Sequence, residues 1–228
     1  MQNLIDKLRV PKVLLRYIMM NFTDFNTIKH LVLNVKSMNV LDNHSKNILE
    51  KARYGFDWNC RNGHLTIAKW LYYISRVDIH DQNEHAFSGA CQNNHIDVAK
   101  WLYVLGQVDI HANMEYAFRC SCQNNHINVA KWLYVLGQID IHADNEYAFR
   151  LSCQHGHLAV AKWLYVLDQI DIHALDGEAF KHCCINGHLA VAQWLYSLGQ
   201  IDIRDLDKYV LICSPKKIKD WLNLIRKN

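Results

Sequence analysis

The chain has 228 residues, half of them hydrophobic, with only two prolines and a formal net charge of +3 at pH 7. This length and composition suit one well-buried, elongated domain without a linker. The charges form no basic stripe with interleaved aromatics, and the apolar run 13–20 near the start is too short to cross a bilayer, so neither nucleic-acid binding nor a membrane span is expected.

Residues 1–51 are expected to form an N-terminal helical cap that includes a degenerate repeat. Helical sequence covers 3–20, and 28–43 echoes the second helix and finger of the repeat described below. A longer insertion, 43–53, follows. Residues 10–18 (VPKVLLRYI) resemble the opening of an F-box, which docks to a ubiquitin ligase scaffold, although the sequence departs from that pattern afterwards.

Most of the chain is one unit written five times. Five tryptophans lie 31 residues apart, and in each copy a Cys stands ten positions before the Trp, a His six before and a Tyr two after. A fixed period of this size indicates stacked repeats, in which no unit closes its own core. The five tryptophans are Trp70, Trp101, Trp132, Trp163 and Trp194.

Within the copy 146–174, the first predicted helix is 147–154, with Phe149 and either Ser152 or Cys153 facing inward. The turn His155-Gly156 then reverses the chain, because glycine adopts backbone angles that other residues resist. The unit therefore starts with a short helix and a tight turn.

The second predicted helix of this copy is 158–167, where apolar side chains recur at i, i+3, i+4 and i+7 and Lys162 points the other way. The segment 171–174 (DIHA) alternates in polarity and suits an extended finger that leads into the next unit. The inward residues of the helix are Val160, Trp163, Leu164 and Leu167.

The segment 149–165 (FRLSCQHGHLAVAKWLY), followed by DIHA, resembles the ankyrin repeat, which has a Gly-His turn, a Val-rich second helix and an Asp-Val-Asn-Ala finger. The family's Thr-Pro opening is replaced here by Tyr-Ala or equivalents, and the unit is shorter than the family's roughly 33 residues. The resemblance covers about residues 52–205 and implies an all-α, right-handed solenoid, elongated and curved, with a trimmed finger. The AKWLY and DIHA variants look most like the ankyrin proteins of giant DNA viruses of amoebae.

Residues 206–228 are predicted to form a C-terminal capping repeat. Trp221 and Leu222 belong to a helical apolar stripe, with lysines such as Lys216 and Lys219 on the other side. A terminal repeat needs such a polar outer face.

The repeated Cys-x-x-x-His pairs could suggest zinc, but two ligands per copy do not close a site that needs about four. Neighbouring copies would lie about 8–10 Å apart, too far to share an ion or a disulfide. We therefore expect no metal or other cofactor, and read the cysteines as small buried free thiols in a reducing cytoplasm and the histidines as side chains that bridge the turn.

A second histidine column occupies the finger position where the ankyrin pattern has Asn. The simpler interpretation is that the imidazole replaces the Asn amide in holding the finger by hydrogen bonds. The alternative is a pH-sensitive strip, since His titrates near neutrality, or one that an oxygenase hydroxylates, as finger residues of ankyrin proteins can be. These residues are His80, His111, His142 and His173.

Positions that differ between copies are free to recognise a partner, and they form two strips. Ankyrin proteins use the equivalent positions on their concave groove to contact other proteins. The finger strip consists of Asp81, Gln82, Asn83, Asn113, Met114, Asp144, Asn145, Leu175 and Asp176. The turn strip, at the end of each first helix, consists of Arg61, Asn62, Gln92, Asn93, Gln123, Asn124, Gln154, His155, Ile185 and Asn186.

Catalytic signatures such as Gly-x-Ser-x-Gly and His-Glu-x-x-His are absent from the sequence. Five equivalent copies also do not provide the singular constellation that catalysis requires. The sequence therefore predicts a monomeric, non-catalytic scaffold that binds a partner protein in the cytoplasm, which would be the host cytoplasm for a viral protein. The alternative is a substrate-recruiting ubiquitin ligase adaptor that uses the F-box-like segment.

Overall fold

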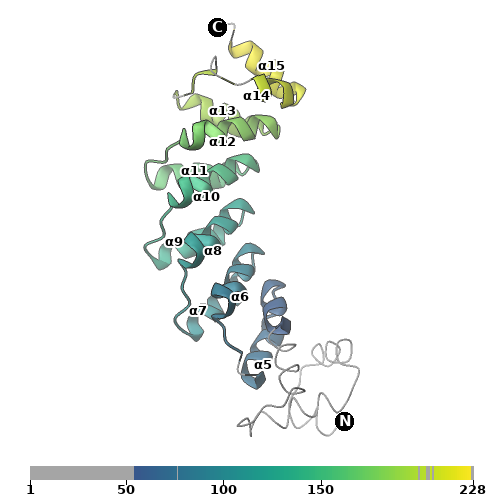
Figure 1. Ribbon diagram of the computed structural model, residues 1–228, viewed down its shortest axis with the longest axis vertical. Helices are drawn as coiled ribbons and strands as arrows, with labels where there is room; N and C mark the ends of the chain where they lie inside the picture. Colours follow the sequence, from purple (N-terminus) through teal and green to yellow (C-terminus); the bar gives the residue numbers. More distant parts are fainter. Residues whose placement is uncertain (1–53, 76, 200, 204–205, 207, 227–228) are drawn as a thin grey trace.

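The computed structural model describes residues 54–75, 77–199, 201–203, 206 and 208–226, and all regular secondary structure among them is helical. The predicted N-terminal cap, the F-box-like segment and the insertion 43–53 lie outside these residues. The described helices form an elongated, curved stack of antiparallel pairs, with the connections between pairs along one edge (Figure 1). The predicted all-α repeat stack is thereby confirmed.

Each pair consists of a first helix, a tight turn and a second helix, and each first helix from α6 to α12 packs against the first helix of the next pair. The first helices are residues 54–61, α6 (Asp81–Gln92), α8 (Ala112–Gln123), α10 (Ala143–Gln154), α12 (Ala174–Ile185) and α14 (Lys208–Cys213). The second helices are α5 (Leu65–Ser75), α7 (Ile96–Leu105), α9 (Ile127–Leu136), α11 (Leu158–Leu167), α13 (Leu189–Ser197) and α15 (Lys216–Ile225).

The predicted inward faces are confirmed in the copy 146–174. Phe149, Ser152 and Cys153 are all buried on α10, so both alternatives for the inward position hold. On α11, Val160 and Leu164 are buried, Trp163 and Leu167 are partly buried, and Lys162 is exposed. Helix α11 has the bounds that the sequence predicted.

The aromatic column joins neighbouring pairs. The ring of Trp163 lies 6.2 Å from Phe118 and 6.0 Å from Tyr134, both in the preceding pair, with the Tyr134 ring edge-on to it. Trp221 of α15 makes the same contacts with Phe180 and Tyr196, although it follows Trp194 by 27 residues instead of 31. Trp163 and Trp221 therefore pack between pairs, and α15 continues this ladder.

The finger is more compact than the predicted extended segment. In α6, α8, α10 and α12 the second to fourth residues all have positive φ, as in Asp144, Asn145 and Glu146 (φ 59°, 53° and 61°). The Glu146 amide donates to the His142 carbonyl at 3.1 Å, which closes this left-handed turn. We call the three residues the finger tip, and the right-handed part of each first helix begins directly after it.

All eight cysteines are free, and Cys213 alone is exposed. Burial raises the pKa of the Cys91, Cys122 and Cys153 thiols far above its usual value, so these thiols are inert packing groups. Among the described residues, no group of three or more His, Cys, Asp or Glu is arranged to hold a metal ion. None of the described helices has the length and apolar character needed to span a bilayer.

Candidate functional site

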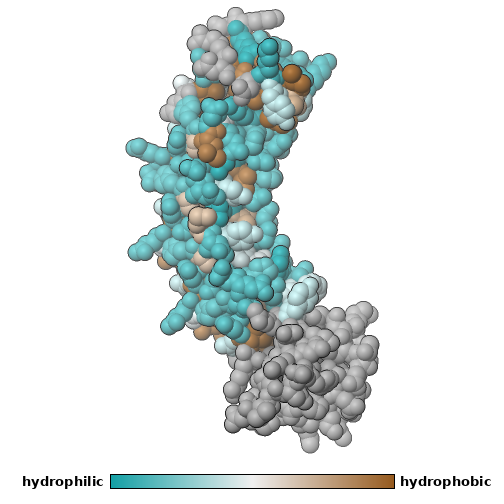
Figure 2. Space-filling model, in the orientation of Figure 1, coloured by the Kyte–Doolittle hydropathy of each residue, from teal (hydrophilic) through white to brown (hydrophobic). Residues whose placement is uncertain are grey.

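The finger and turn strips both lie on accessible parts of the stack. Every residue of the two strips is exposed or partly exposed. Figure 2 shows one side of the molecule as largely hydrophilic, with apolar side chains in separate spots and more of them near α14 and α15. The side seen in Figure 2 therefore presents separate apolar side chains rather than one continuous apolar patch.

A buried carboxylate holds each of the first three finger tips. Glu115 Oε1 lies 2.8 Å from His111 Nδ1 and also accepts the backbone N–H of Asp140, in the next pair, at 3.3 Å. Only about 6% of Glu115 is exposed. The same contacts link His80 with Glu84 and His142 with Glu146, whereas Gly177 replaces the Glu beside His173. The hydrogen-bonding interpretation of the finger histidines is thus confirmed for the three that face a Glu.

Two buried arginines support the finger tips at the middle of the groove. Arg119 donates to Asp144 Oδ2 at 2.7 Å and to the Asn113 carbonyl at 2.9 Å. Its guanidinium also lies 4.6 Å from the centre of the Tyr147 ring. Arg150 flanks the other side of this network: it donates to the carbonyls of Asp144 and Asn145 and to Glu178. These residues hold the groove wall in place.

Part of the turn strip also has a structural role. The side-chain amides of Asn93, Asn124 and Asn186 donate to backbone carbonyls of the preceding pair at 2.9–3.2 Å. The turn histidines do the same, since the rings of His126 and His157 bond to the carbonyls of Gln92 and Gln123. The sequence predicted histidines that bridge the turn, and the structure places these two rings against the turn of the preceding pair.

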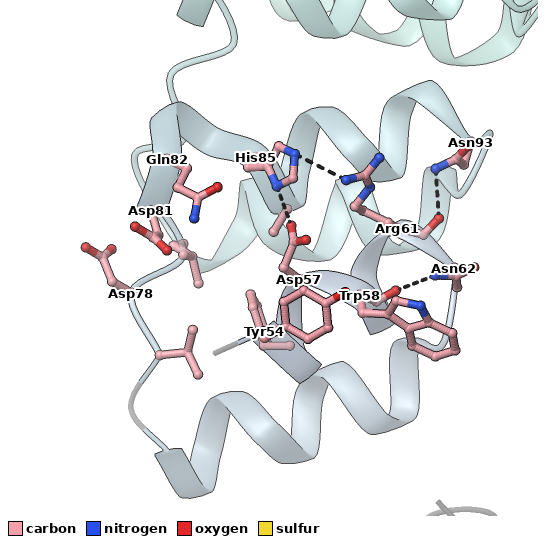
Figure 3. Close-up of a pocket in the computed structure, with 14 residues that line it drawn as sticks. Tyr54, Asp57, Trp58, Arg61, Asn62, Asp78, Asp81, Gln82, His85 and Asn93 are labelled. Atoms are coloured by element: carbon pink, nitrogen blue, oxygen red, sulfur yellow. Dashed lines mark hydrogen bonds and ion pairs between the residues drawn. The ribbon is translucent and has the colours of Figure 1, made fainter. Parts of the chain in front are cut away.

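The end of the described stack nearest the N-terminus contains a cavity of about 660 Å³ between the 54–61 helix and α6 (Figure 3). His85 Nδ1 lies 2.9 Å from Asp57 Oδ1, and His85 Nε2 lies 3.2 Å from Arg61 Nη1. Tyr54 and Trp58 also line the cavity and come from the same helix as Asp57 and Arg61. The lining residues that the sequence predicted are Arg61, Asn62, Asp81, Gln82 and Asn93.

Residues 56–145 match the family model described as ankyrin repeats (3 copies). These residues are ankyrin repeats. No curated protein matches the chain at a significant level. Ankyrin repeats generally mediate protein–protein interactions and are typically non-catalytic.

Sequence reasoning missed nine of the fourteen residues that line the cavity, among them Tyr54, Asp57, Trp58, Asp78 and His85, although the ankyrin register carries a signal for some of them. Tyr54 and His85 occupy the position of Tyr147, and Asp57 occupies the position of Arg119 and Arg150. Asp57 and Trp58 stand three and two positions before Cys60, on the helix that the structure describes over residues 54–61. Comparing whole helix faces between repeats, rather than the turn and finger alone, would have shown that the first repeat differs from the others here.

Proposed function

We propose that the chain is a non-catalytic scaffold that binds a partner protein along the groove formed by the first helices and the finger tips. Residues that face inward are nearly constant between repeats, while the exposed finger and turn strips differ from repeat to repeat. A constant interior builds the stack, and a variable lining gives the groove a distinct surface at each repeat.

The observation that carries this proposal is the pair of apolar residues at the finger tips. Met114 is 65% exposed and Leu175 is 54% exposed, and both have positive φ. A side chain with a Cβ costs about 1–2 kcal/mol in this conformation relative to the right-handed helical one. An exposed apolar residue in a costly backbone conformation gains nothing from folding, whereas a partner that covers it would bury the side chain.

The test is affinity capture from the native cell with a Met114→Arg/Leu175→Arg double variant. We expect the variant to lose the partner that the wild type captures. The matched control is Val135→Arg/Val166→Arg, because these valines are even more exposed than Met114 and Leu175 but lie on the second helices. Retention of the partner by the finger-tip variant, or its loss only in the control, would show that the groove is not the contact surface.

Asp144 and the asparagines of the turn strip are less suitable for this test. Asp144 is the partner of the buried Arg119, and Asn93 bonds to the preceding repeat, so their substitution would disturb the stack as well as the surface. A loss of binding in those variants would have two explanations.

Two more specific hypotheses, a viral origin and a ligase adaptor, rest on the sequence alone. The viral origin, and with it the host cytoplasm, rests on the AKWLY and DIHA variants of the repeat. The ligase adaptor rests on residues 10–18; capture with and without residues 1–50 tests it, and failure to recover a ligase scaffold with the full chain would contradict it.

A further inference from the structure

We propose that the last repeat, α14 and α15, binds the surface of a lipid bilayer that contains anionic phospholipids. The contact uses one end of the stack (Figure 1), so it is a second surface that does not depend on the groove. Three features carry the proposal: replaced residues at this end, cations without carboxylate partners, and the opposite charge of the other repeats. We call the residues concerned the terminal patch: Lys208, Tyr209, Ile212, Lys216, Lys217 and Lys219.

A serine contact fixes the register of α14. Ser214 Oγ donates to the Val210 carbonyl at 2.6 Å, as Ser152 Oγ donates to the Ala148 carbonyl at 2.7 Å on α10. Both serines and both acceptor residues are buried. The residues of α14 therefore align one by one with those of α10, with Ser214 at the position of Ser152.

Two side chains that join one repeat to the next are replaced in α14. Glu146 accepts a backbone N–H of the next repeat, Arg150 donates to a carboxylate of the next repeat, and both residues are at most 8% exposed. In the aligned positions α14 has Lys208 and Ile212, which are exposed to solvent. The end of the stack thus presents a cation and an apolar side chain where the interior repeats have buried polar contacts.

The exposed side of α14 is apolar. Tyr209 is 67% exposed and Ile212 is 71% exposed, whereas Val210 is buried against the stack. The Tyr209 hydroxyl interacts with the exposed Cys213 one turn later, and Lys219 Nζ donates to the Ile212 carbonyl at 2.8 Å. A lysine therefore lies directly beside the apolar side, and Figure 2 shows more apolar side chains near α14 and α15 than elsewhere on that face.

The cations of the last repeat have no carboxylate partners. Residues 208–226 contain five Lys or Arg and one acidic residue, Asp220. Within the described part of the chain none of the five forms an ion pair, and Lys219 and Arg226 donate to backbone carbonyls, which leaves their charge in place. By contrast, both buried arginines of the groove and Lys181 pair with carboxylates. The terminal patch therefore carries an uncompensated positive charge.

The rest of the stack has the opposite charge. Residues 54–75 and 77–199 together contain fourteen Asp or Glu and eight Lys or Arg. An anionic surface attracts the last repeat and repels the repeats before it, and such a field orients a charged molecule as it approaches. The expected contact is therefore end-on, with α14 and α15 at the bilayer and the other repeats directed away from it.

The apolar side chains favour lipid over a soluble polyanion. Lysines attract any anionic partner, but Ile212 adds nothing to the binding of a phosphate backbone or an acidic peptide chain. At a bilayer, an exposed aliphatic side chain enters the boundary below the headgroups and a tyrosine ring lies at the headgroup level. Lysine stems lie along the apolar region while their ammonium groups reach the phosphates. Tyr209, Ile212 and the neighbouring lysines match this arrangement.

The experiment measures co-sedimentation of the full chain with vesicles at about 0.1 M salt, where the Debye length is about 10 Å. One set of vesicles contains phosphatidylcholine with roughly 30% phosphatidylserine, and the other contains phosphatidylcholine alone. We expect at least about tenfold stronger binding to the anionic vesicles. An environment-sensitive dye on Cys213, the exposed thiol, should shift to shorter wavelength with these vesicles and stay unchanged with soluble poly-L-glutamate.

The first pair of variants tests the position of the charge. Lys216→Gln/Lys217→Gln should weaken binding to anionic vesicles by about 25-fold, or about fivefold for each lysine at the surface. The matched control, Lys100→Gln/Lys131→Gln, removes the same charge from exposed lysines on α7 and α9 and should leave binding nearly unchanged. Circular dichroism verifies that each variant is folded.

The third variant tests the apolar side chains at constant charge. Tyr209→Ser/Ile212→Ser keeps every lysine, and we expect about tenfold weaker binding to anionic vesicles because the side chains no longer enter the boundary region. The dye on Cys213 should then show little shift. Both residues are exposed, so the substitutions leave the interior of the stack intact.

Several results would overturn the proposal. They are equal binding to the two kinds of vesicle, no binding to either, an equal loss in the lysine control, and unchanged binding by the Lys216/Lys217 or the Tyr209/Ile212 variant. A dye shift with poly-L-glutamate as large as that with vesicles would make an acidic polypeptide the occupant instead. The groove proposal is tested separately, since Met114→Arg/Leu175→Arg should lose the partner protein and still bind the vesicles.

Discussion

Arg61 and Gly89 are matched in size across the first two described repeats: a Cβ at Gly89 would come 2.3 Å from Arg61 Cγ and 2.9 Å from Arg61 Cδ. One repeat further on, the position of Arg61 is taken by the shorter Gln92 and the position of Gly89 by the larger Cys120. The long Arg61 side chain therefore reaches His85 because Gly89 leaves a path for it.

The first prediction concerns this pair. Gly89 is in the interior of α6, where Ala is favoured by about 1 kcal/mol in free energy of unfolding. In the wild type, we expect Gly89→Ala to lose that gain because the new methyl group displaces Arg61. In an Arg61→Ala background, the same change should stabilise the chain by about 1 kcal/mol. Urea unfolding of the wild type, the two single variants and the double variant measures this coupling, and equal effects in both backgrounds would show that the two residues do not interact.

The second prediction concerns the aromatic ladder. Trp163→Ala removes the ring that packs on Phe118 and Tyr134, so we expect a loss of about 3 kcal/mol in the free energy of unfolding. Val166→Ala, one turn away on α11 and 82% exposed, should change it by less than about 0.5 kcal/mol. Urea unfolding checks both, and a Trp163→Ala variant as stable as Val166→Ala would contradict an inter-repeat role for the ring.

The sequence was sufficient for the parts of the fold that depend on periodicity. The 31-residue spacing, the Gly-His turn and the i, i+3, i+4, i+7 stripe of α11 each have one physical solution, an amphipathic helix pair stacked on copies of itself. The alternation of Asp171, Ile172 and His173 was also informative, since only Ile172 is buried. These features depend on residues close together in the sequence, and they recur in every repeat.

The finger and the cavity were less accessible to prediction because they depend on contacts between repeats. Glu146 accepts a hydrogen bond from the next repeat, so its burial follows from a neighbour 25 residues away. Asp57 and His85 are 28 residues apart and meet only when the helices stack. Aligning the repeats on their 31-residue period shows which helix face these residues share. It does not show which hydrogen bonds they form, because those depend on how the repeats stack.

The third prediction concerns the arginine at the middle of the groove. Arg119→Met should lower the free energy of unfolding by about 2 kcal/mol, because it removes hydrogen bonds to Asp144 and to the Asn113 carbonyl. Arg119→Lys should recover little of this loss, since an ammonium does not reproduce the forked geometry. The control is Lys181→Met, at the equivalent position of α12 beside the well-exposed Asp176. Thermal or urea unfolding decides the point, and full recovery by Lys would mean that charge alone matters.

The fourth prediction concerns pH. Burial lowers the pKa of His126 and His157, so the unfolded state binds more protons as the pH falls below about 6.5, and the free energy of unfolding falls with it. The hydrogen bond to Glu146 raises the pKa of His142, whose contribution is present below about pH 6.5 and is lost as the pH rises through the folded value.

Urea unfolding at about pH 5.5 and 7.5 tests both signs. We expect the wild type to be less stable at the lower pH. His126→Asn/His157→Asn should reduce that difference, and His142→Asn should enlarge it. If His126→Asn/His157→Asn enlarged the stability difference between the two pH values and His142→Asn reduced it, the directions of these pKa shifts would be contradicted.

The fifth prediction concerns the buried carboxylate of the finger tip. Glu115 has φ 61°, where an L side chain is unfavourable, and its Oε1 bonds to His111 and to the Asp140 amide. Glu115→Ala keeps the unfavourable backbone and loses both bonds, so we expect a loss of about 2 kcal/mol in the free energy of unfolding. Glu115→Gly loses the same bonds but relieves the backbone, and should be about 1 kcal/mol more stable than the Ala variant.

This order is the reverse of the usual one inside a helix, where Ala is more stable than Gly. Position 177, where the chain itself has Gly at φ 70°, shows that the turn accepts glycine. Urea unfolding ranks the two variants; an Ala variant more stable than the Gly variant would mean that Glu115 is not held in the left-handed conformation.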